Sequence, residues 1–466
     1  MSTKGCRTSA LLAFVVLALP ASGASAASLE DSIQSALETN PRVGVVQADR
    51  QAIDQELRQA RAQYLPSLDL RGAAGPEYTN SPATRSRNNG GDSNTLLRLE
   101  SQLTLSQMLF DGFATQSEVE RQLARVDSAA HRVQEAAEFV ALDAVEAHLD
   151  VLRNQELVEL ARENLDEHQR ILDRVTRLEQ QGAGSIADLR QSEARSASAR
   201  SALATTVGTL RDAGATYISV VGMPAENLQE PVAPRPALPE SAEAAAAAAA
   251  VSSPTVEIAQ SDIDVAKAEL DGSRAGYYPR VDLELGTSAN RNIDGIEGRD
   301  IDAQALVVLR YNLFRGGGDI AREREAFARV REARQQLALD RRQAEEDARI
   351  AYNALLTAHE RVDALRAEAA AQRATRDAYA QQFDLGQRSL LDLLDGENQL
   401  FIARSNLATA EYTERFAVYR VLAVIGALLD TLGIDRPKET IDIYRQRQES
   451  IHETPVSVEP SPPGGN

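Results

Sequence analysis

The sequence has few of the residues that stabilise compact globular folds. Its 466 residues include one cysteine, no tryptophan and only 4% aromatic residues. A chain of this length ordinarily divides into about three domains, but so few aromatic side chains argue against three compact, aromatic-filled cores. A disulfide-stapled scaffold is excluded as well, because one cysteine cannot form a disulfide within the chain.

Basic residues are outnumbered by acidic ones. The chain has 50 Lys and Arg against 69 Asp and Glu, which gives a net charge of −19. Affinity for nucleic acid depends on basic side chains that neutralise phosphates, so nucleic acid is not an expected partner. The shares of hydrophobic (43%) and charged (26%) residues are ordinary for an ordered chain, so extensive disorder is not predicted.

The first 26 residues have the pattern of a secretory signal peptide. Lys4 and Arg7 precede an apolar run at 11–19, and the small residues at 24–26 fit a cleavage motif. The apolar run is too short for a membrane-spanning helix, which needs about 20 residues. Cleavage removes Cys6, the only cysteine. Because no later stretch is apolar enough to span a bilayer as a helix, we expect a bacterial envelope protein that can enter a membrane only as β-strands.

The rest of the chain contains a tandem repeat. With a shift of 213 positions, residues 40–71 match residues 253–284 without a gap. With a shift of 204, Leu109-Phe110-Asp111-Gly112 matches Leu313-Phe314-Arg315-Gly316, and the match continues through the following segment. The nine extra residues of the first copy fall between Pro66 and Phe110, where we expect an exposed loop. We therefore predict a first repeat at 27–226 and a second at 227–432.

The absence of proline predicts unusually long helices. No proline occurs at 83–223 or 280–436, and the helix-forming stretches 113–180 and 317–384 would each be on the order of 100 Å long. A glycine-containing turn follows each, and then a second helix of about 30 to 40 residues. Further helices are expected at 41–64 and 254–277, both beginning with proline. Helices of this length must pack side by side as coiled coils.

Two segments change to the period of a β-strand. Leucines at 97, 99, 103 and 105 alternate with polar residues, and the second repeat alternates in the same way from 303 to 313. We predict hairpins at about 67–110 and 280–314, with four strands of about ten residues that are apolar on one face. A soluble sheet over a core is the alternative. A membrane sheet of four strands could not close, so it would require self-association, with two copies giving eight strands or three giving twelve.

Four pieces of sequence resemble a known family. They are Leu29-Glu30-Asp31-Ser32-Ile33 followed by Ala36-Leu37 and Asn40-Pro41, then Leu65-Pro66-Ser67-Leu68, Leu109-Phe110-Asp111-Gly112, and Tyr311-Asn312-Leu313-Phe314-Arg315-Gly316-Gly317. In this order, and with the matching repeat, they resemble the TolC family of trimeric outer-membrane channel proteins over residues 28–432.

The resemblance implies a mainly α fold with a small antiparallel β part. A duplicated long-helix coiled-coil tube would stand in the periplasm, and four strands per protomer would contribute to a twelve-stranded trimeric β-barrel in the lipid of the cell outer membrane. The partners implied are a periplasmic adaptor (membrane fusion) protein and an inner-membrane ABC or proton-driven transporter. Segments 28–40, 227–253 and 433–449 would form an equatorial belt, and residues 454–466 a disordered tail.

The resemblance also gives roles to residues at the two helix–helix turns. Acidic rings of Asp392 and Asp395 at the periplasmic entrance would concentrate cations. Arg388 would pair with Asp188 of a neighbouring hairpin as a gate latch. Phe383 stands where a tyrosine is usual and cannot donate a hydrogen bond. Turn and cap residues would form the hairpin tips for adaptor docking, namely Gly182, Gly184, Ser185, Gly386 and Ser389.

A simpler reading exists for two of these acids. Ser185 with Asp188, and Ser389 with Asp392, have the spacing of a helix capping box, and capping could be the whole role of both carboxylates.

Seven of the 20 aromatic residues gather where helices should meet strands. Junction packing explains some of them, but a barrel also needs aromatic side chains at the membrane interface. They are Tyr64, Phe110, Phe113, Tyr277, Tyr278, Tyr311 and Phe314.

No pattern suggests an enzyme, a metal site or a cofactor. The five histidines have no metal-ligand spacing and are expected on helix surfaces or in the tail; they are His131, His148, His168, His359 and His452. Glycines 316–318 lack the Lys-Ser/Thr of a phosphate-binding loop.

We therefore expect an outer-membrane exit duct, serving type I protein secretion or, alternatively, drug efflux. A soluble periplasmic coiled-coil scaffold or adaptor without a pore is the alternative from another class.

Overall fold

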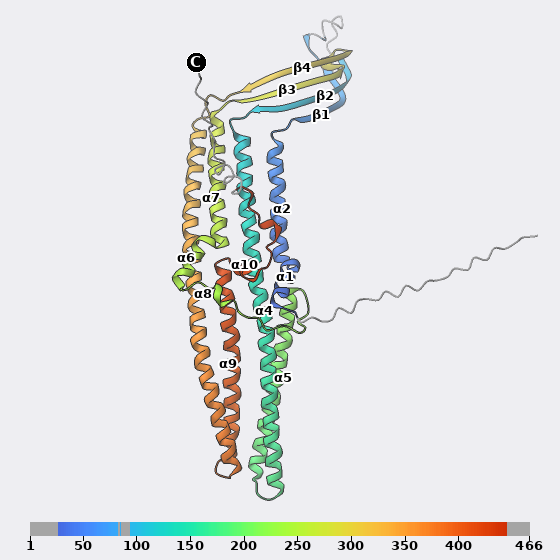
Figure 1. Ribbon diagram of the computed structural model, residues 1–466. Coiled ribbons are helices and arrows are strands. Elements are labelled where there is room, and N and C mark those ends of the chain that lie inside the picture. Colours follow the sequence, from blue (N-terminus) through green and yellow to red (C-terminus); the bar gives the residue numbers. More distant parts are fainter. Residues whose placement is uncertain (1–26, 83, 85–93, 445–466) are drawn as a thin grey trace, which may run out of the picture.

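The computed structural model of the chain describes residues 27–82, 84 and 94–444, which form an elongated molecule (Figure 1). Two helices of 67 residues each, α4 (Ala114–Gln180) and α8 (Gly318–Asp384), run along most of its length. A four-stranded antiparallel sheet projects from one end. The predicted fold class, mainly α with a small antiparallel sheet, is confirmed. The signal peptide, the loop tip around 88–91 and the disordered tail lie outside the described residues.

The long helices differ from the prediction by one residue at their first turn. Phe113 and Gly317, expected as their first residues, instead precede them in a left-handed conformation, with φ of 70° and 84°. The return helices are α5 (Ile186–Val221) and α9 (Leu390–Val424). The proline-initiated helices are α2 (Pro41–Ala62) and α7 (Pro254–Ser273). The second ends in a 3-10 turn, η2 (Arg274–Tyr277), where a continuous helix was expected.

The long helices α4 and α8 have different neighbours at the two ends of the molecule. On the sheet side, α4 lies between α2 and α7, and α7 also contacts α8. At the opposite end, the hairpins α4–α5 and α8–α9 lie side by side along a seam between α4 and α9 (Figure 1). Among the described residues, no helix combines the length and apolarity needed to cross a membrane.

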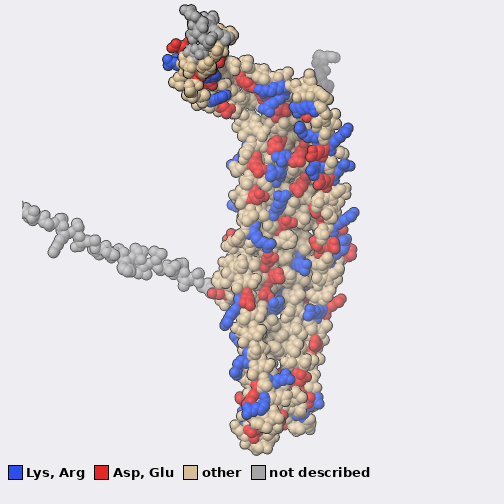
Figure 2. All heavy atoms as spheres, turned by 180° about the vertical axis from the view of Figure 1, so that it is seen from behind, with Lys and Arg blue, Asp and Glu red and all other residues tan. Residues whose placement is uncertain are grey.

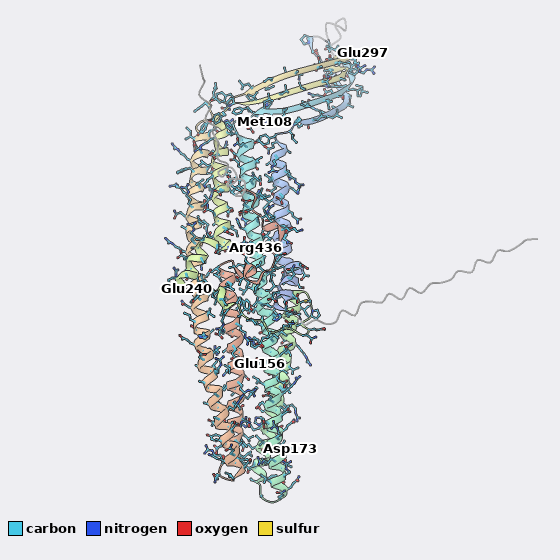
Figure 3. The ribbon with its side chains drawn as sticks, viewed as in Figure 1. Met108, Glu156, Asp173, Glu240, Glu297 and Arg436 are labelled. Atoms are coloured by element: carbon cyan, nitrogen blue, oxygen red, sulfur yellow. The ribbon has the colours of Figure 1, made fainter. Side chains whose placement is uncertain are left out.

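Short elements from the start of each repeat and from the C-terminal part of the described chain surround the middle of the long helices (Figure 1). They are α1 (Leu29–Thr39), η1 (Arg235–Ala237), α6 (Ala242–Ser252), α10 (Leu428–Leu432) and η4 (Lys438–Thr440). Glu240 and Arg436 mark this level in Figure 3. The largest apolar cluster among the described residues lies here and includes fully buried Ile33, Leu422 and Leu428. Each such side chain stabilises the fold by about 1.5–3 kcal/mol. We call this region the belt.

A buried polar network ties the belt to α4. The hydroxyl of Ser32 lies 2.9 Å from Nδ1 of His148 and 2.8 Å from the Tyr217 hydroxyl. Nε2 of His148 donates to the carbonyl of Gln229 at 2.8 Å. Burial lowers the pKa of His148, which favours the neutral imidazole that this network needs.

The expectation that all the histidines lie on helix surfaces or in the tail is wrong for three of them. His131, His148 and His168 are buried, because α4 is covered on several sides by other helices.

Two acids of α4 hold the C-terminal segment. Asp127 accepts hydrogen bonds from the backbone N–H groups of Ile443 and Tyr444, at 2.7 and 3.0 Å. Glu138 accepts one from the N–H of Leu428 at 3.2 Å, and its other carboxylate oxygen has no hydrogen-bond partner among the described residues. Burial raises the pKa of Glu138 to about 7, although Arg436 acts in the opposite direction.

The sheet has the simple order β1-β2-β3-β4. Its strands are β1 (Ser67–Thr79), β2 (Asn94–Phe110), β3 (Arg280–Arg291) and β4 (Arg299–Arg310). Met108 lies where the sheet meets the helices and Glu297 lies at its far end (Figure 3). The outer edges of β1 and β4 have no partner strand within the described chain.

Strand register separates an apolar face from a polar one. Cross-strand partners lie on the same face. One face pairs Leu68 with Leu105, Leu70 with Leu103, Leu105 with Leu285, Leu283 with Val307, and Val281 with Leu309. The other pairs Asp69 with Thr104, Ser106 with Glu284, Asp282 with Met108, and Gly286 with Gln304. The predicted alternation is therefore present over four strands.

The second hairpin is shorter than predicted. β4 ends at Arg310 rather than 314, and the N–H of Phe314 donates to the Asn312 side chain at 3.1 Å, as in a local turn. By contrast, β2 extends to Phe110 because β3 pairs with it there. Tyr311, Leu313 and Phe314 are consequently left exposed.

Glu138 gives a prediction for pH. Because its pKa is raised from 4.5 to about 7 in the folded chain, the folded state binds the proton more tightly, and stability is lost as pH rises from about 4.5 to 7. Glu138→Gln should therefore increase the free energy of unfolding at pH 8 by up to about 3 kcal/mol, and so raise the melting temperature, while changing both little at pH 4. Thermal unfolding followed by circular dichroism measures this.

The control is Glu146→Gln, which changes an exposed acid on the same helix and should have no such effect. An equal loss of stability at both pH values would contradict the prediction.

Candidate functional site

Both predicted hairpin tips lie at the end of the molecule opposite the sheet (Figure 1). In the first, Gly182 is left-handed with φ of 75°, and the N–H groups of Ala183 and Gly184 donate to the carbonyl of Leu178 at 2.9 and 3.0 Å. In the second, Gly386 is left-handed with φ of 69°. The two turns are thus built alike, as expected for repeated sequences.

Serine caps start both return helices. The Ser185 side chain accepts the N–H of Ala187 at 3.1 Å. The Ser389 side chain accepts the N–H of Asp392 at 3.3 Å, and its hydroxyl donates to the Asp392 carboxylate at 2.8 Å. Of the two carboxylates, Asp392 therefore takes part in its cap, whereas Asp188 has no hydrogen bond or ion pair to another side chain in the described part of the chain.

The second tip carries the two predicted acids on one helix face. Asp392 is half-buried and lies 3.6 Å from Nε of Arg388. Asp395, one turn further on, is exposed, and nothing in residues 27–82, 84 and 94–444 pairs with it. Arg388 also stacks over the ring of Tyr379, with its guanidinium carbon 4.2 Å from the ring centroid. Tyr379 belongs to the same helix hairpin and was missed by the sequence analysis.

Arg388 and Asp188 are not brought together within one chain. Arg388 faces Asp392 and Tyr379 on its own hairpin. The predicted latch concerns the hairpin of a neighbouring protomer, so it stays a prediction.

Phe383 lies in the seam between the two hairpins. It packs against an apolar cluster that includes Ile171 and Val175 of α4 and Leu394 of α9. The guanidinium of Arg174 lies 5.9 Å from the Phe383 ring centroid and 2.5 Å from the Asp384 carboxylate. Arg174 therefore links the end of α4 to the end of α8. Sequence reasoning missed this residue, because no local pattern shows which distant helix end packs against it.

Further ion pairs continue along the seam towards the belt. Arg376 of α8 lies 3.2 Å from Glu397 of α9 and 3.9 Å from Glu167 of α4. Arg404 of α9 lies 2.5 Å from Glu163 of α4. Burial raises the pKa of Glu397, with Arg376 acting against it. These charges line a cavity of about 240 Å³ between α4, α8 and α9.

Three of the seven predicted aromatic residues contact one another where the sheet joins the helices. The rings of Phe110, Phe113 and Tyr278 contact one another edge to face, with centroids 5.4 to 6.4 Å apart. The hydroxyl of Tyr277 donates to Glu323 at 3.0 Å. Tyr64, Tyr311 and Phe314 are exposed and take no part in this cluster. The junction thus brings residues of both repeats together.

Across the described ranges, no group of three or more His, Cys, Asp or Glu side chains is arranged to hold a metal ion. On the face shown in Figure 2, acidic and basic side chains are interspersed along the helices. The distinctive groups are the acids at the second tip and the ion pairs of the seam.

Comparison with known proteins identifies the family. The family model described as outer membrane efflux protein matches residues 32–222 and 246–427. The chain belongs to the outer membrane efflux protein family. Its predicted resemblance to TolC-type channels is thereby confirmed.

Relatives and solved structures agree over most of the chain. The outer membrane efflux protein BepC of Brucella suis biovar 1 (strain 1330) is 25% identical over 439 residues, 92% of this chain and 93% of BepC. The proteases secretion protein PrtF of Dickeya chrysanthemi is 25% identical over 416 residues, 87% of this chain and 89% of PrtF. The crystal structure of a membrane protein from Pseudomonas aeruginosa is similar in fold, with a TM-score of 0.74 at 19% identity, covering 89% of this chain and 92% of that one.

Membership of the outer membrane efflux protein family has two consequences. The protein is located in the outer membrane with its helical part in the periplasm, as predicted. The family consists of channel and transport proteins, which favours an exit duct over the soluble scaffold and over an enzyme.

The seam contact gives a prediction for dynamics. Arg174→Ala removes the ion pair with Asp384 and the cation over Phe383. Because these charged groups are half exposed, the loss should be below about 1 kcal/mol, and amide exchange over 381–394 should quicken by a few-fold. Hydrogen exchange of the full chain followed by mass spectrometry measures this. The control Arg190→Ala removes an ion pair within α5 alone, so exchange over 381–394 should stay unchanged. Equal exchange in both variants would show that Arg174 does not restrain the second tip.

Proposed function

We propose that three copies of this chain form an exit duct that carries cargo from the periplasmic side to the cell exterior. The supporting observation is the sheet: its apolar face suits lipid, yet both of its edges lack a partner strand in the described chain. Unpaired backbone groups are costly in lipid, so the strands must close with those of other copies. Twelve strands from three copies would give a barrel with a wet interior, since the polar faces would line it.

The hairpin tips would form the periplasmic entrance. Threefold symmetry would turn Asp392 and Asp395 into two rings of three carboxylates, one helical turn apart. Such rings concentrate cations in a constriction. The exposed Asp395, which has no partner in the described chain, is the acid best placed to act in this way.

Replacing the two acids tests the entrance. Asp392→Asn with Asp395→Asn should weaken cation selectivity and block by multivalent cations, because six carboxylates leave the constriction. Reversal potentials in planar bilayers under a salt gradient measure the selectivity.

A matched variant, Glu360→Gln with Asp363→Asn, removes two acids at the same spacing from α8. It should leave multivalent block unchanged. Unchanged selectivity and block in the Asp392/Asp395 variant would overturn the proposed entrance.

The tips would also hold the entrance shut. Arg388 of one protomer would reach Asp188 of its neighbour, and this exchange would compete with the contacts of Arg388 to Asp392 and Tyr379. Phe383 gives no hydrogen bond there, and its role would be apolar packing in the seam. The turn and cap residues at 182–185 and 386–389 would present the docking surface for the adaptor.

Arg388→Ser should raise the resting conductance of single channels, because the cation that draws neighbouring tips together is lost. Single-channel recordings in planar bilayers measure this, with Arg190→Ser as a control that removes a nearby arginine from α5. If conductance stays at the wild-type level, Arg388 is not a latch.

The cargo we propose is protein exported by a type I secretion system. PrtF, whose name states protease secretion, supports this, whereas the name of BepC states efflux. The partners would be an adaptor and an inner-membrane ABC transporter. Neighbouring genes encoding a proton-driven pump would instead favour drug efflux.

The exposed aromatics would lie at the membrane interface. Tyr64, Tyr311 and Phe314 stand at the junction level, where the barrel would leave the bilayer on its periplasmic side.

A further inference from the structure

The two repeats contain corresponding segments, so a contact within the chain can be compared with the same pair of segments elsewhere in the chain. Residues 109–112 end the first hairpin and correspond, at a shift of 204, to residues 313–316, which follow the second hairpin. The segment that receives 109–112 is 275–278, which corresponds at a shift of 213 to residues 62–65. The first pair of segments touches within the chain. The second pair lies at opposite edges of the sheet.

The contact within the chain is close. Gly112 has a left-handed backbone with φ of 71°, and a β-carbon there would lie 2.7 Å from the Ala275 carbonyl oxygen and 2.7 Å from Cβ of Tyr278. Neither distance is possible for a real side chain, so glycine is required. Phe110 adds an edge-to-face contact with the ring of Tyr278 at 6.4 Å.

The equivalent surface in the second repeat is bare. Gly316 has the same left-handed backbone, with φ of 64°, but no atom of the described chain lies within 4 Å of where its β-carbon would be. Leu313 is 86% exposed, against 53% for its counterpart Leu109. Phe314 is 83% exposed, whereas Phe110 is half-buried. The glycine and both apolar residues are therefore present without the surface that explains them in the first repeat.

On the sheet side, helix α8 also lacks, within the described chain, a neighbour that its counterpart α4 has. α4 packs against α2 on one side and α7 on the other, and it is buried along most of its length. On the sheet side α8 packs against α7, the counterpart of α2, and no described element takes the position corresponding to α7. Its exposed apolar residues include Ile320 and Phe327 near the junction. The missing neighbour is the counterpart of α7, which is α2.

We infer that Gly316 and Phe314 receive residues 62–65 of a second copy of this chain. Ala62 of the partner subunit would take the place of Ala275, and Leu65 of the partner subunit the place of Tyr278. The contact closes β4 of one copy against β1 of the next and sets α8 beside the next α2. The inference rests on the proposed trimer and assigns its contact residues at the junction.

Two adjacent glycines give a matched test. Gly316→Ala and Gly317→Ala carry the same left-handed strain, with φ of 64° and 84°, and neither new β-carbon meets any atom of the single chain. Only position 316 should be covered in the assembly. Position 317 corresponds to Phe113, which already carries a side chain at φ of 70°.

Trimer content of the full chain in detergent, by light scattering after size exclusion, is the readout. Gly316→Ala should weaken trimer formation about tenfold or more, because the added carbon collides with the partner's backbone. Gly317→Ala should assemble like the wild type. Equal trimer content in the two variants would overturn the inference. A wild-type chain that stays monomeric would instead refute the proposed duct.

Cross-linking provides a second measurement that does not depend on destabilising the assembly. The only natural cysteine, Cys6, lies in the predicted signal peptide, so introduced cysteines should be free of competing thiols. Phe314→Cys with Leu65→Cys should give covalent dimers and trimers on oxidation. Phe110→Cys with Tyr278→Cys should cross-link within single chains. If the second pair reacts and a trimeric Phe314/Leu65 variant gives no covalent oligomers, the assigned contact is wrong.

Discussion

The proposed duct depends on one constraint, that every backbone N–H and C=O of a sheet in lipid needs a partner. The chain supplies four strands with an apolar face, and within the described residues the outer edges of β1 and β4 have no partner strand. In the proposed duct, closure would therefore come from other copies. The same requirement fixes the helices below, because each strand pair is joined to helices that continue from it. In the proposed trimer, copies that share a barrel would also share the helical tube beneath it, and the exposed face of α8 would be the helical counterpart of the open edge of β4.

The long helices are held together at three levels along the molecule. The long helices have little aromatic content to pack, and their buried residues are largely alanine, valine and leucine. Three regions hold them in place: the aromatic junction at the sheet, the belt with its buried Ser32, His148 and Tyr217, and the seam near the tips. The belt is the most apolar of these, whereas the seam relies on half-exposed ion pairs. Separation of the hairpins at the tips should therefore cost less than separation at the belt.

Much of the architecture could be predicted because it follows from local sequence patterns. The lack of proline and the glycine turns located the long helices to within one residue, and the change to period two located the strands. What failed depends on distant contacts. An alanine-rich helix does not show how many of its faces are covered, so the burial of His131, His148 and His168 was missed. Arg174 meets Asp384 across more than 200 residues of sequence, and no spacing indicates that pair. β4 was predicted too long because its alternation continues beyond the last residue that has a partner strand.

The attachment of the C-terminal segment to α4 has a consequence for biogenesis. Asp127 and Glu138 lie on a helix of the first repeat, yet their donors come from residues about 300 positions later, at Leu428, Ile443 and Tyr444. During export the acids emerge long before the groups that they bind. A chain cut short in its last forty residues would keep two carboxylates without their donors and an apolar patch at Ile53 and Leu123 without Tyr444. The packing of α4 is thus completed only when residues 428–444 have been exported and have bound to it.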